Sequence, residues 1–130
     1  MAEWSFEVEG KPEPWQVQTR SSARTLSYQR RVAYQAQVQA AAKRYWVGEL
    51  GLAPLTGPVS LRFAFYLPER TGREQEPDLR NLSKAAEDAL QNIVILNDKQ
   101  VVHSEETKVY KPVKGFAGLT VVWVQEVSND

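Results

Sequence analysis

Hydrophobic and polar residues alternate in two stretches of the chain, residues 4–8 and 59–67. A period of two is typical of a strand with one buried face. Gly10 and the prolines after it end the first stretch, and Pro68 ends the second. We therefore predict two strands, and the longer stretch gives the clearest strand signal in the sequence.

Two other stretches carry apolar residues at helical spacing. The first runs from Ser27, a favourable N-cap, to about Trp46, and the second begins at Asp78, also a favourable N-cap. The apolar positions of the first are Tyr34, Val38, Ala41, Ala42 and Tyr45. Those of the second are Leu79, Leu82, Ala85, Ala86, Ala89 and Leu90. Each helix should bury one face.

Two further strands complete the order of elements. The sequence predicts a strand from about Gln100 to Tyr110 and a last strand from Leu119 to Glu126, paired as a hairpin across residues 115–118. The order β-α-β-α-β-β predicts an α/β fold, with two helices on a mixed sheet in two layers. Residues 1–130 should form a single domain, since there is no repeat or internal linker.

The composition excludes several kinds of protein. Without cysteine there are no disulfides, no thiol catalysis and no cysteine-ligated zinc. The one histidine, His103, excludes a multi-histidine metal site, and a lone histidine on a strand is more often packed or exposed than catalytic. No apolar run approaches the roughly 20 residues of a membrane span, and the first residues do not read as a signal peptide. We expect a cytoplasmic protein without a membrane segment.

The chain has no net charge, but its charges are unevenly distributed. Basic residues dominate residues 11–44, whereas carboxylates dominate residues 69–78. A basic surface beside an acidic cluster suits a protein that holds phosphates around a divalent cation, although both segments also fit ordinary solvated surfaces. The candidate phosphate contacts in the basic segment are Lys11, Arg20, Arg24, Arg30 and Arg31.

The second predicted helix and the turn after it hold the candidate chemistry. Asn81, Lys84 and Asp88 are three and four residues apart, so they line one polar stripe below Asp78. Asp98 leads into the next strand, and closure of the fold could bring it towards Asp78. Two converging carboxylates can hold Mg²⁺ or Mn²⁺, with a lysine near the phosphate or the attacking water. The same residues also fit structural roles as a helix cap, a turn residue and an i,i+4 pair.

The order of residue types in this region is specific. An Asp is followed by Asn-Leu-x-Lys-Ala, Asp-Ala-Leu, a short connection and Asp-x-Gln-Val at the start of a strand. These residues are Asp78, Asn81, Leu82, Lys84, Ala85, Asp88, Ala89, Leu90, Asp98, Gln100 and Val101. In this pattern the chain resembles the RusA-type Holliday junction resolvases. The segment Gly10-Lys11-Pro12-x-Pro14 and the later Lys108 extend the resemblance more loosely to both ends.

The resemblance implies a homodimeric, magnesium-dependent endodeoxyribonuclease that resolves four-way DNA junctions in recombination and repair. It implies that Asp78 and Asp98 bind Mg²⁺ (or Mn²⁺) and that Lys84 contacts the phosphate or the transition state. Asn81 would orient a ligand or a metal-bound water, whereas Asp88 lies almost three helical turns from Asp78 and suits a structural role. The expected DNA contacts are Lys11, Arg20, Arg24, Arg30, Arg31 and Lys108.

Two positions depart from the family pattern. Arg80 stands where the pattern has a second Asp, and Asn97 stands where it has the first of two paired acids. The metal site therefore loses two carboxylates, and Arg80 adds repulsion if it faces the site. We expect replacement oxygen ligands from Glu74, Glu76 or Glu105.

Two alternatives to a working nuclease stay open at this point. The first is a catalytically weakened protein that binds DNA junctions without competent metal chemistry. The second is a small α/β scaffold that has kept only the fold. Metal and DNA dependence separate the three hypotheses, because the nuclease needs both, the binding protein needs only DNA, and the scaffold needs neither.

Overall fold

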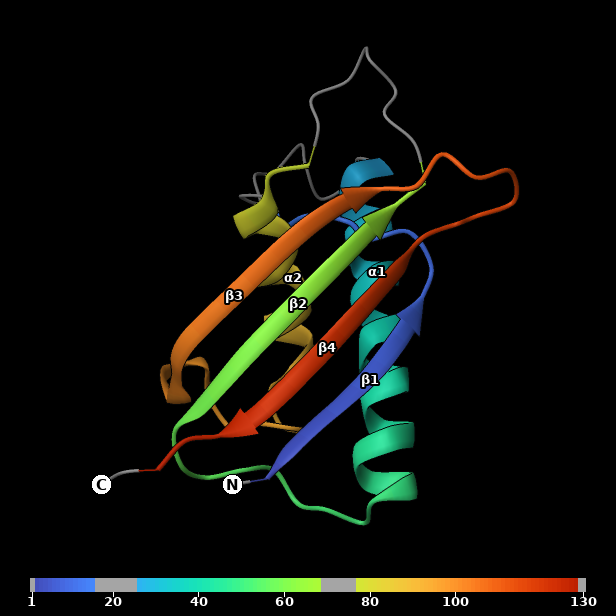
Figure 1. Cartoon of the computed structure of the whole chain (residues 1–130). Helices are drawn as coiled ribbons and strands as arrows, with labels where there is room; N and C mark the ends of the chain where they lie inside the picture. Colours follow the sequence, from blue (N-terminus) through green and yellow to red (C-terminus); the bar gives the residue numbers. More distant parts are fainter. Residues whose placement is uncertain (1, 16–25, 69–76, 129–130) are drawn as a thin grey trace.

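The structure is a computed structural model that describes residues 2–15, 26–68 and 77–128. Four strands form one sheet, and both long helices cover the same face of it (Figure 1). The strands are β1 (Glu3–Glu9), β2 (Val59–Leu67), β3 (Val101–Tyr110) and β4 (Leu119–Glu126). The helices are α1 (Leu26–Ala42) and α2 (Leu79–Leu90), with a π-helical turn η2 (Lys43–Glu49) and a 3-10 turn η3 (Asp98–Gln100). The predicted two-layer α/β fold, with two helices on a mixed sheet, is confirmed.

The predicted hairpin between the last two strands is wrong. The strand order is β1-β4-β2-β3, in which β4 is antiparallel to β1 on one side and to β2 on the other. β3 pairs in parallel with β2. The physical reason is burial: Val122 and Val124 of β4 are fully buried, which favours a central strand over an edge strand. The connection after β3 is also much longer than a tight hairpin turn.

The core lies between the sheet and the helices. The inward-facing row of β2 is buried as its alternation predicted, and it comprises Val59, Leu61, Phe63, Phe65 and Leu67. The helices complete the core with Tyr34, Val38 and Ala42 of α1 and with Leu82, Ala85, Ala86, Ala89 and Leu90 of α2. Trp46 of η2 is fully buried, and its indole Nε1 donates to the Ala53 carbonyl at 2.9 Å. The helical patterns therefore identified the buried faces.

The sequence predicted the first residue of α2 correctly but not that of α1. Asp78 is the N-cap of α2, as predicted, because its side chain accepts from the backbone N–H groups of Arg80 and Asn81. Ser27 lies inside α1 and is not its N-cap, since α1 includes Leu26.

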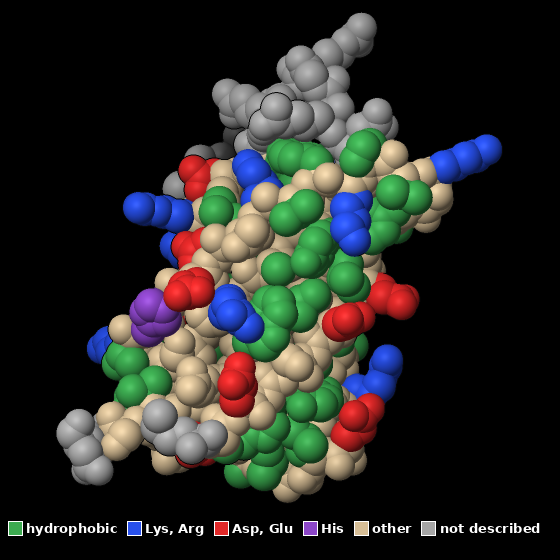
Figure 2. Space-filling view, in the orientation of Figure 1, with side chains coloured by type: hydrophobic (Ala, Val, Ile, Leu, Met, Phe, Trp, Pro, Cys, Tyr) green, Lys and Arg blue, Asp and Glu red, His purple; other side chains and the backbone are tan. Residues whose placement is uncertain are grey.

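The opposite face of the sheet carries mixed side chains. Figure 2 shows hydrophobic, basic and acidic groups side by side on this face. The Arg62 guanidinium carbon lies 4.2 Å from the centroid of the Trp123 ring, and Lys111 Nζ lies 5.0 Å from that of Tyr66. Long cationic side chains thus cover part of the aromatic surface on this side.

The Gln100 side chain fixes the turn that precedes β3. Its Nε2 donates to the carbonyls of Leu55 at 2.7 Å and Gly57 at 2.9 Å. Its Oε1 accepts from the backbone N–H of Leu96 at 2.8 Å and of Asn97 at 2.9 Å. Only an amide side chain offers two donors and an acceptor in this arrangement. The glutamine of the Asp-x-Gln-Val pattern therefore has a structural role.

Gln100→Ala should lower the free energy of unfolding by about 1–3 kcal/mol, because it removes hydrogen bonds to four backbone groups, and the bond to the Leu55 carbonyl is partly buried. Gln100→Glu keeps the acceptor but places a carboxylate oxygen against the carbonyls of Leu55 and Gly57, so its loss should be at least as large. Urea denaturation measures both values. The neighbouring Lys99→Ala is the control and should change stability by less than about 0.5 kcal/mol. Equal losses in Gln100→Ala and Lys99→Ala would contradict this role.

Candidate active site

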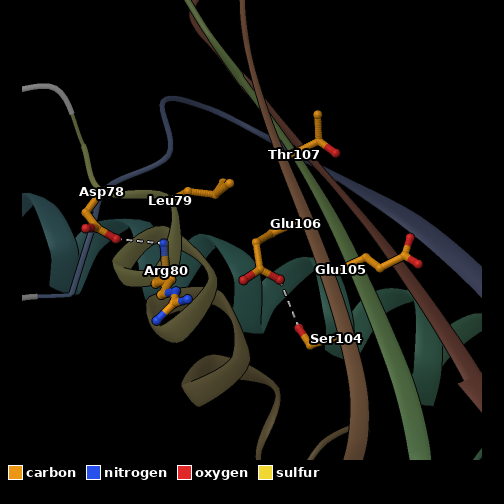
Figure 3. A pocket seen from close by; sticks show the side chains of 7 residues that line it. All are labelled: Asp78, Leu79, Arg80, Ser104, Glu105, Glu106 and Thr107. Atoms are coloured by element: carbon orange, nitrogen blue, oxygen red, sulfur yellow. Dashed lines mark hydrogen bonds between the residues drawn. The ribbon is translucent and has the colours of Figure 1, made fainter.

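A pocket of about 600 Å³ lies between the first turn of α2 and strand β3. Its lining residues are Asp78, Leu79, Arg80, Ser104, Glu105, Glu106 and Thr107. Asp78 and Arg80 come from the start of the helix, and the Glu106 side chain points from β3 towards them (Figure 3). The carboxylates of Asp78 and Glu106 and the guanidinium of Arg80 therefore meet in the pocket from two elements that are distant in sequence, whereas the side chain of the third acidic lining residue, Glu105, points away (Figure 3).

Asp78 holds the start of α2 through one of its carboxylate oxygens. Oδ1 accepts from the backbone N–H of Arg80 at 2.8 Å and of Asn81 at 3.3 Å. The positive end of the helix dipole also stabilises the charged carboxylate. The second oxygen takes no part in these two bonds, so the structural and the ligand interpretations of Asp78 are compatible.

The alternation of β3 decides which glutamate enters the pocket. The Glu106 side chain points towards α2, where it accepts a hydrogen bond from Ser104 Oγ at 3.1 Å (Figure 3). The Glu105 side chain points to the opposite face of the sheet and contacts His103 Nε2 at 3.1 Å. Glu105 is therefore unsuited to the role of replacement ligand that the sequence suggested for it. Glu74 and Glu76, the other two candidates, lie outside the described residues.

Sequence reasoning missed Glu106 for a physical reason. Strand β3 has no fully buried residue, so its burial pattern does not mark an inward and an outward face. The parallel pairing with β2 sets the orientation of each side chain on β3. That pairing was not part of the prediction, which placed the last strand beside β3 instead.

Asp98 lies at the other end of α2, outside the pocket lining. It opens η3, and its electrostatic neighbours are Glu87 and Asp88 near the end of the helix. Nine to ten helical residues separate these two from Asp78, which is about 14 Å along the axis. The short connection from α2 to β3 keeps Asp98 near the end of the helix. The structure therefore does not bring Asp78 and Asp98 together in one pocket.

Asn97, the second departure from the family pattern, serves as a cap. Its Oδ1 accepts from the backbone N–H of Lys99 at 2.8 Å, and it forms a capping box with Gln100. An Asn makes this bond as well as an Asp does. The turn therefore keeps its geometry although it has lost a carboxylate.

The carboxyl groups near the end of α2 bind protons more tightly than usual. Burial, followed by the negative charge of Asp98, raises the pKa of Glu87 to about 7. Burial also raises the pKa of Asp88, while the nearby charges of Lys84 and Arg31 oppose this and that of Asp98 adds to it. Glu87 therefore carries a proton for part of the time near neutral pH.

Protein stability should fall as the pH rises from about 4.5 to about 7. Within this window the folded chain keeps the Glu87 proton, whereas the unfolded chain loses it at the ordinary value of 4.5. Glu87→Gln should remove about 1–2 kcal/mol of this dependence, allowing for solvent screening at a half-buried group. Urea denaturation at pH 5 and pH 8 measures it, with exposed Glu49→Gln as control. The same pH dependence in wild type and Glu87→Gln would contradict the assignment.

Lys84 is exposed but held in one orientation. Its Nζ lies 3.6 Å from the centroid of the Trp15 ring. The Trp15 backbone N–H donates to the Asn81 carbonyl at 2.8 Å, which fixes the ring against α2. Trp15 therefore contacts the helix through its backbone and the lysine through its ring.

A comparison with family models decides what kind of protein carries this site. The model described as Endodeoxyribonuclease RusA matches residues 6–117. The chain belongs to the RusA endodeoxyribonuclease family. The resemblance noted in the sequence is confirmed, and RusA membership implies an endonuclease that resolves Holliday junctions. No curated protein matches the chain.

The donor chemistry of the RusA pocket fits a magnesium ion. Asp78, Glu106 and Ser104 offer hard oxygen donors, which Mg²⁺ prefers, and Mg²⁺ often takes only one or two carboxylates together with waters and substrate phosphates. Within the described ranges, no three acidic or histidine side chains gather closely enough to enclose a metal. Arg80 in the same pocket weakens cation binding by its charge.

Arg31 differs from the surface cation expected for a RusA enzyme. Its exposed fraction is only 9%, and its Nε is buried without a hydrogen-bond partner. Its guanidinium carbon lies 5.2 Å from the centroid of the Tyr28 ring. Burial suits packing and an electrostatic effect on Asp88 better than direct contact with a phosphate.

The other expected DNA contacts have varied environments. Lys11 is exposed, with its Nζ 3.9 Å from a Glu13 carboxylate oxygen, and Arg30 is exposed on α1. Lys108 Nζ donates to the Pro77 carbonyl at 2.9 Å, directly before Asp78. Arg20 and Arg24 lie outside the described residues. No helix in the described part of this RusA family member could cross a membrane.

Proposed function

We propose that this protein is a magnesium-dependent endonuclease that resolves Holliday junctions in recombination and repair, acting as a homodimer of single-domain chains. The observation that carries the proposal is the position of Asp78, a residue of the RusA pattern, in an open pocket with oxygen donors. An open pocket admits a phosphodiester backbone, and a divalent cation there would meet the ligand type that it prefers.

Each pattern residue has a distinct role in this proposal. Asp78 would hold the cation, since one of its carboxylate oxygens takes no part in the two capping bonds. When bound, Mg²⁺ would supply Lewis acidity at the phosphate and would lower the pKa of a water molecule. Lys84, oriented by Trp15, stabilises the negative charge that develops on the phosphate. Asn81 orients a ligand or a bound water.

Asp98 is a separate part of the proposal. Its exposed carboxylate belongs to the acidic group at the far end of α2, with Glu87 and Asp88. We propose that it contributes to metal binding, as in the RusA pattern. Asp98→Asn tests this contribution independently of Asp78, by titration with Mn²⁺.

Basic residues would hold the DNA. Exposed Lys11 and Arg30 can reach phosphates from the surface, and Lys108 lies beside the pocket. Arg20 and Arg24, which lie outside the described residues, would add to the proposed surface. Junction affinity should therefore fall steeply with salt, because each neutralised phosphate releases counterions. Arg30→Glu is a better probe of this surface than Arg31→Glu, since Arg31 is buried.

Homodimerisation follows from the substrate in this proposal. A four-way junction needs two symmetric cuts, and a two-fold dimer presents two identical active sites. Sedimentation equilibrium of the full chain, with and without junction DNA, measures the number of copies.

The decisive test is cleavage of a synthetic four-way junction in Mg²⁺, in Mn²⁺ and in EDTA. We expect paired cuts with either metal, no cuts in EDTA, and no cuts in a linear duplex of the same sequence. Tight junction binding without cleavage would favour the catalytically weakened protein, to which the charge of Arg80 points. If the protein neither binds nor cuts the junction, it shares only its fold with the family.

A further inference from the structure

We infer that Glu106 supplies the second carboxylate of the metal pocket and so replaces the acid that Arg80 displaces. The inference rests on the proposed function and deepens it by assigning one more residue to the same site. In this chain the second carboxylate of the site therefore comes from β3, whereas the family pattern has it on α2. Arg80 then becomes a cation beside the site, suited to contact a DNA phosphate.

The positions of the residues carry this inference. Arg80 and Glu106 line one pocket with Asp78, although one comes from α2 and the other from β3. In Figure 3 the Glu106 carboxylate extends from the strand towards the first turn of the helix. A carboxylate on β3 can therefore approach a cation held by Asp78 from the facing side. The pocket keeps two acids even though the helix has lost one.

Glu106 is also held in place for this role. Ser104 Oγ donates to Glu106 Oε2, so the carboxylate is oriented while its other oxygen does not enter this bond. Between described residues, the ion pairs join Lys11 with Glu13 and His103 with Glu105, and neither uses Glu106. The cation next along the same face, Lys108, donates to a backbone carbonyl. Glu106 is therefore oriented and not committed to these partners, and its charge also acts on Glu87 of α2.

A structural alternative predicts a different result. Two carboxylates that share a pocket repel each other, and Arg80 offsets part of that repulsion without any metal. If this is all that Glu106 does, its neutralisation should leave metal affinity unchanged. If Glu106 binds the cation, its neutralisation should lower the affinity.

Calorimetric titration of the full chain with Mn²⁺ distinguishes a metal-binding Glu106 from one that only balances charge. Glu106→Gln keeps the shape and the acceptor for Ser104, and we expect it to lower Mn²⁺ affinity by about tenfold or more. Glu105→Gln is the matched control, one residue away on the opposite face, and should change affinity less than about twofold. Melting temperatures of both variants verify that each has folded.

A rescue variant makes the test sharper. Arg80→Asp in the Glu106→Gln background returns an acid to the helix, so Mn²⁺ affinity should recover to at least the wild-type value. Unchanged affinity in Glu106→Gln, an equal loss in Glu105→Gln, or no recovery in the double variant would overturn the inference. If the wild type still cuts junctions with Mg²⁺ in those cases, the proposed function stands without it. A wild type that neither binds Mn²⁺ nor cuts junctions would overturn both.

Discussion

Asp78→Asn should lower the single-turnover rate of metal-dependent junction cleavage by at least about 10²–10³-fold. The substitution removes the negative charge that faces the pocket. It keeps an acceptor for the backbone N–H groups of Arg80 and Asn81, and Asn caps helices as well as Asp does. The melting temperature should therefore stay close to that of the wild type. Junction affinity should be unchanged or higher, since one repulsive charge towards phosphate is gone.

Asp78→Ala gives the contrast that isolates chemistry from folding. It removes both the charge and the cap, so it should lose cleavage and also about 0.5–2 kcal/mol of stability. Quench measurements with excess enzyme give the cleavage rate, and thermal denaturation gives the stability. Normal cleavage by Asp78→Asn would show that Asp78 only caps α2. A parallel loss of stability and activity in Asp78→Asn would lead to the same conclusion.

Lys84→Met should lower the cleavage rate by about 10²-fold while Mn²⁺ affinity stays within about twofold of wild type. Met is a good helix former of similar length, so α2 should persist. The substitution removes the positive charge of an exposed side chain that lies over the Trp15 ring. Removing the cation also removes a cation–π contact worth about 0.5–1 kcal/mol, so the melting temperature should fall slightly.

Two companion variants test how Lys84 acts. Lys84→Arg keeps the charge in a different shape and should recover only part of the rate. Trp15→Leu keeps the lysine and removes the ring that orients it, so its rate should fall less than that of Lys84→Met. If Lys84→Met cuts at the wild-type rate, Lys84 is a surface residue that only covers the Trp15 ring.

Asn97 and Arg80, the two departures from the family pattern, leave the local backbone hydrogen bonds in place. Asn97 keeps the turn before β3 because an amide caps as well as a carboxylate. Arg80 donates its backbone N–H to Asp78, a bond that does not depend on its side chain. The turn before β3 and the start of α2 therefore keep their backbone hydrogen bonds despite these departures, and only the charge at each place differs.

The sequence by itself determined the local features of the protein. The alternation of β2, the apolar faces of both helices and the Asp78 cap were all predictable, because each depends on residues a few positions apart. The pattern of residues 77–102 also identified the family. These features are fixed by backbone geometry and by side chains close in sequence.

Only the tertiary structure decided which of these elements meet. It placed β4 between β1 and β2, where its backbone pairs with both strands and its buried valines face the core. It separated Asp98 from Asp78 by the length of α2, and it turned Glu106 instead of Glu105 towards the pocket. These outcomes depend on strand pairing between distant segments, which fixes the face and the end of each element, and no periodicity within one segment encodes that pairing.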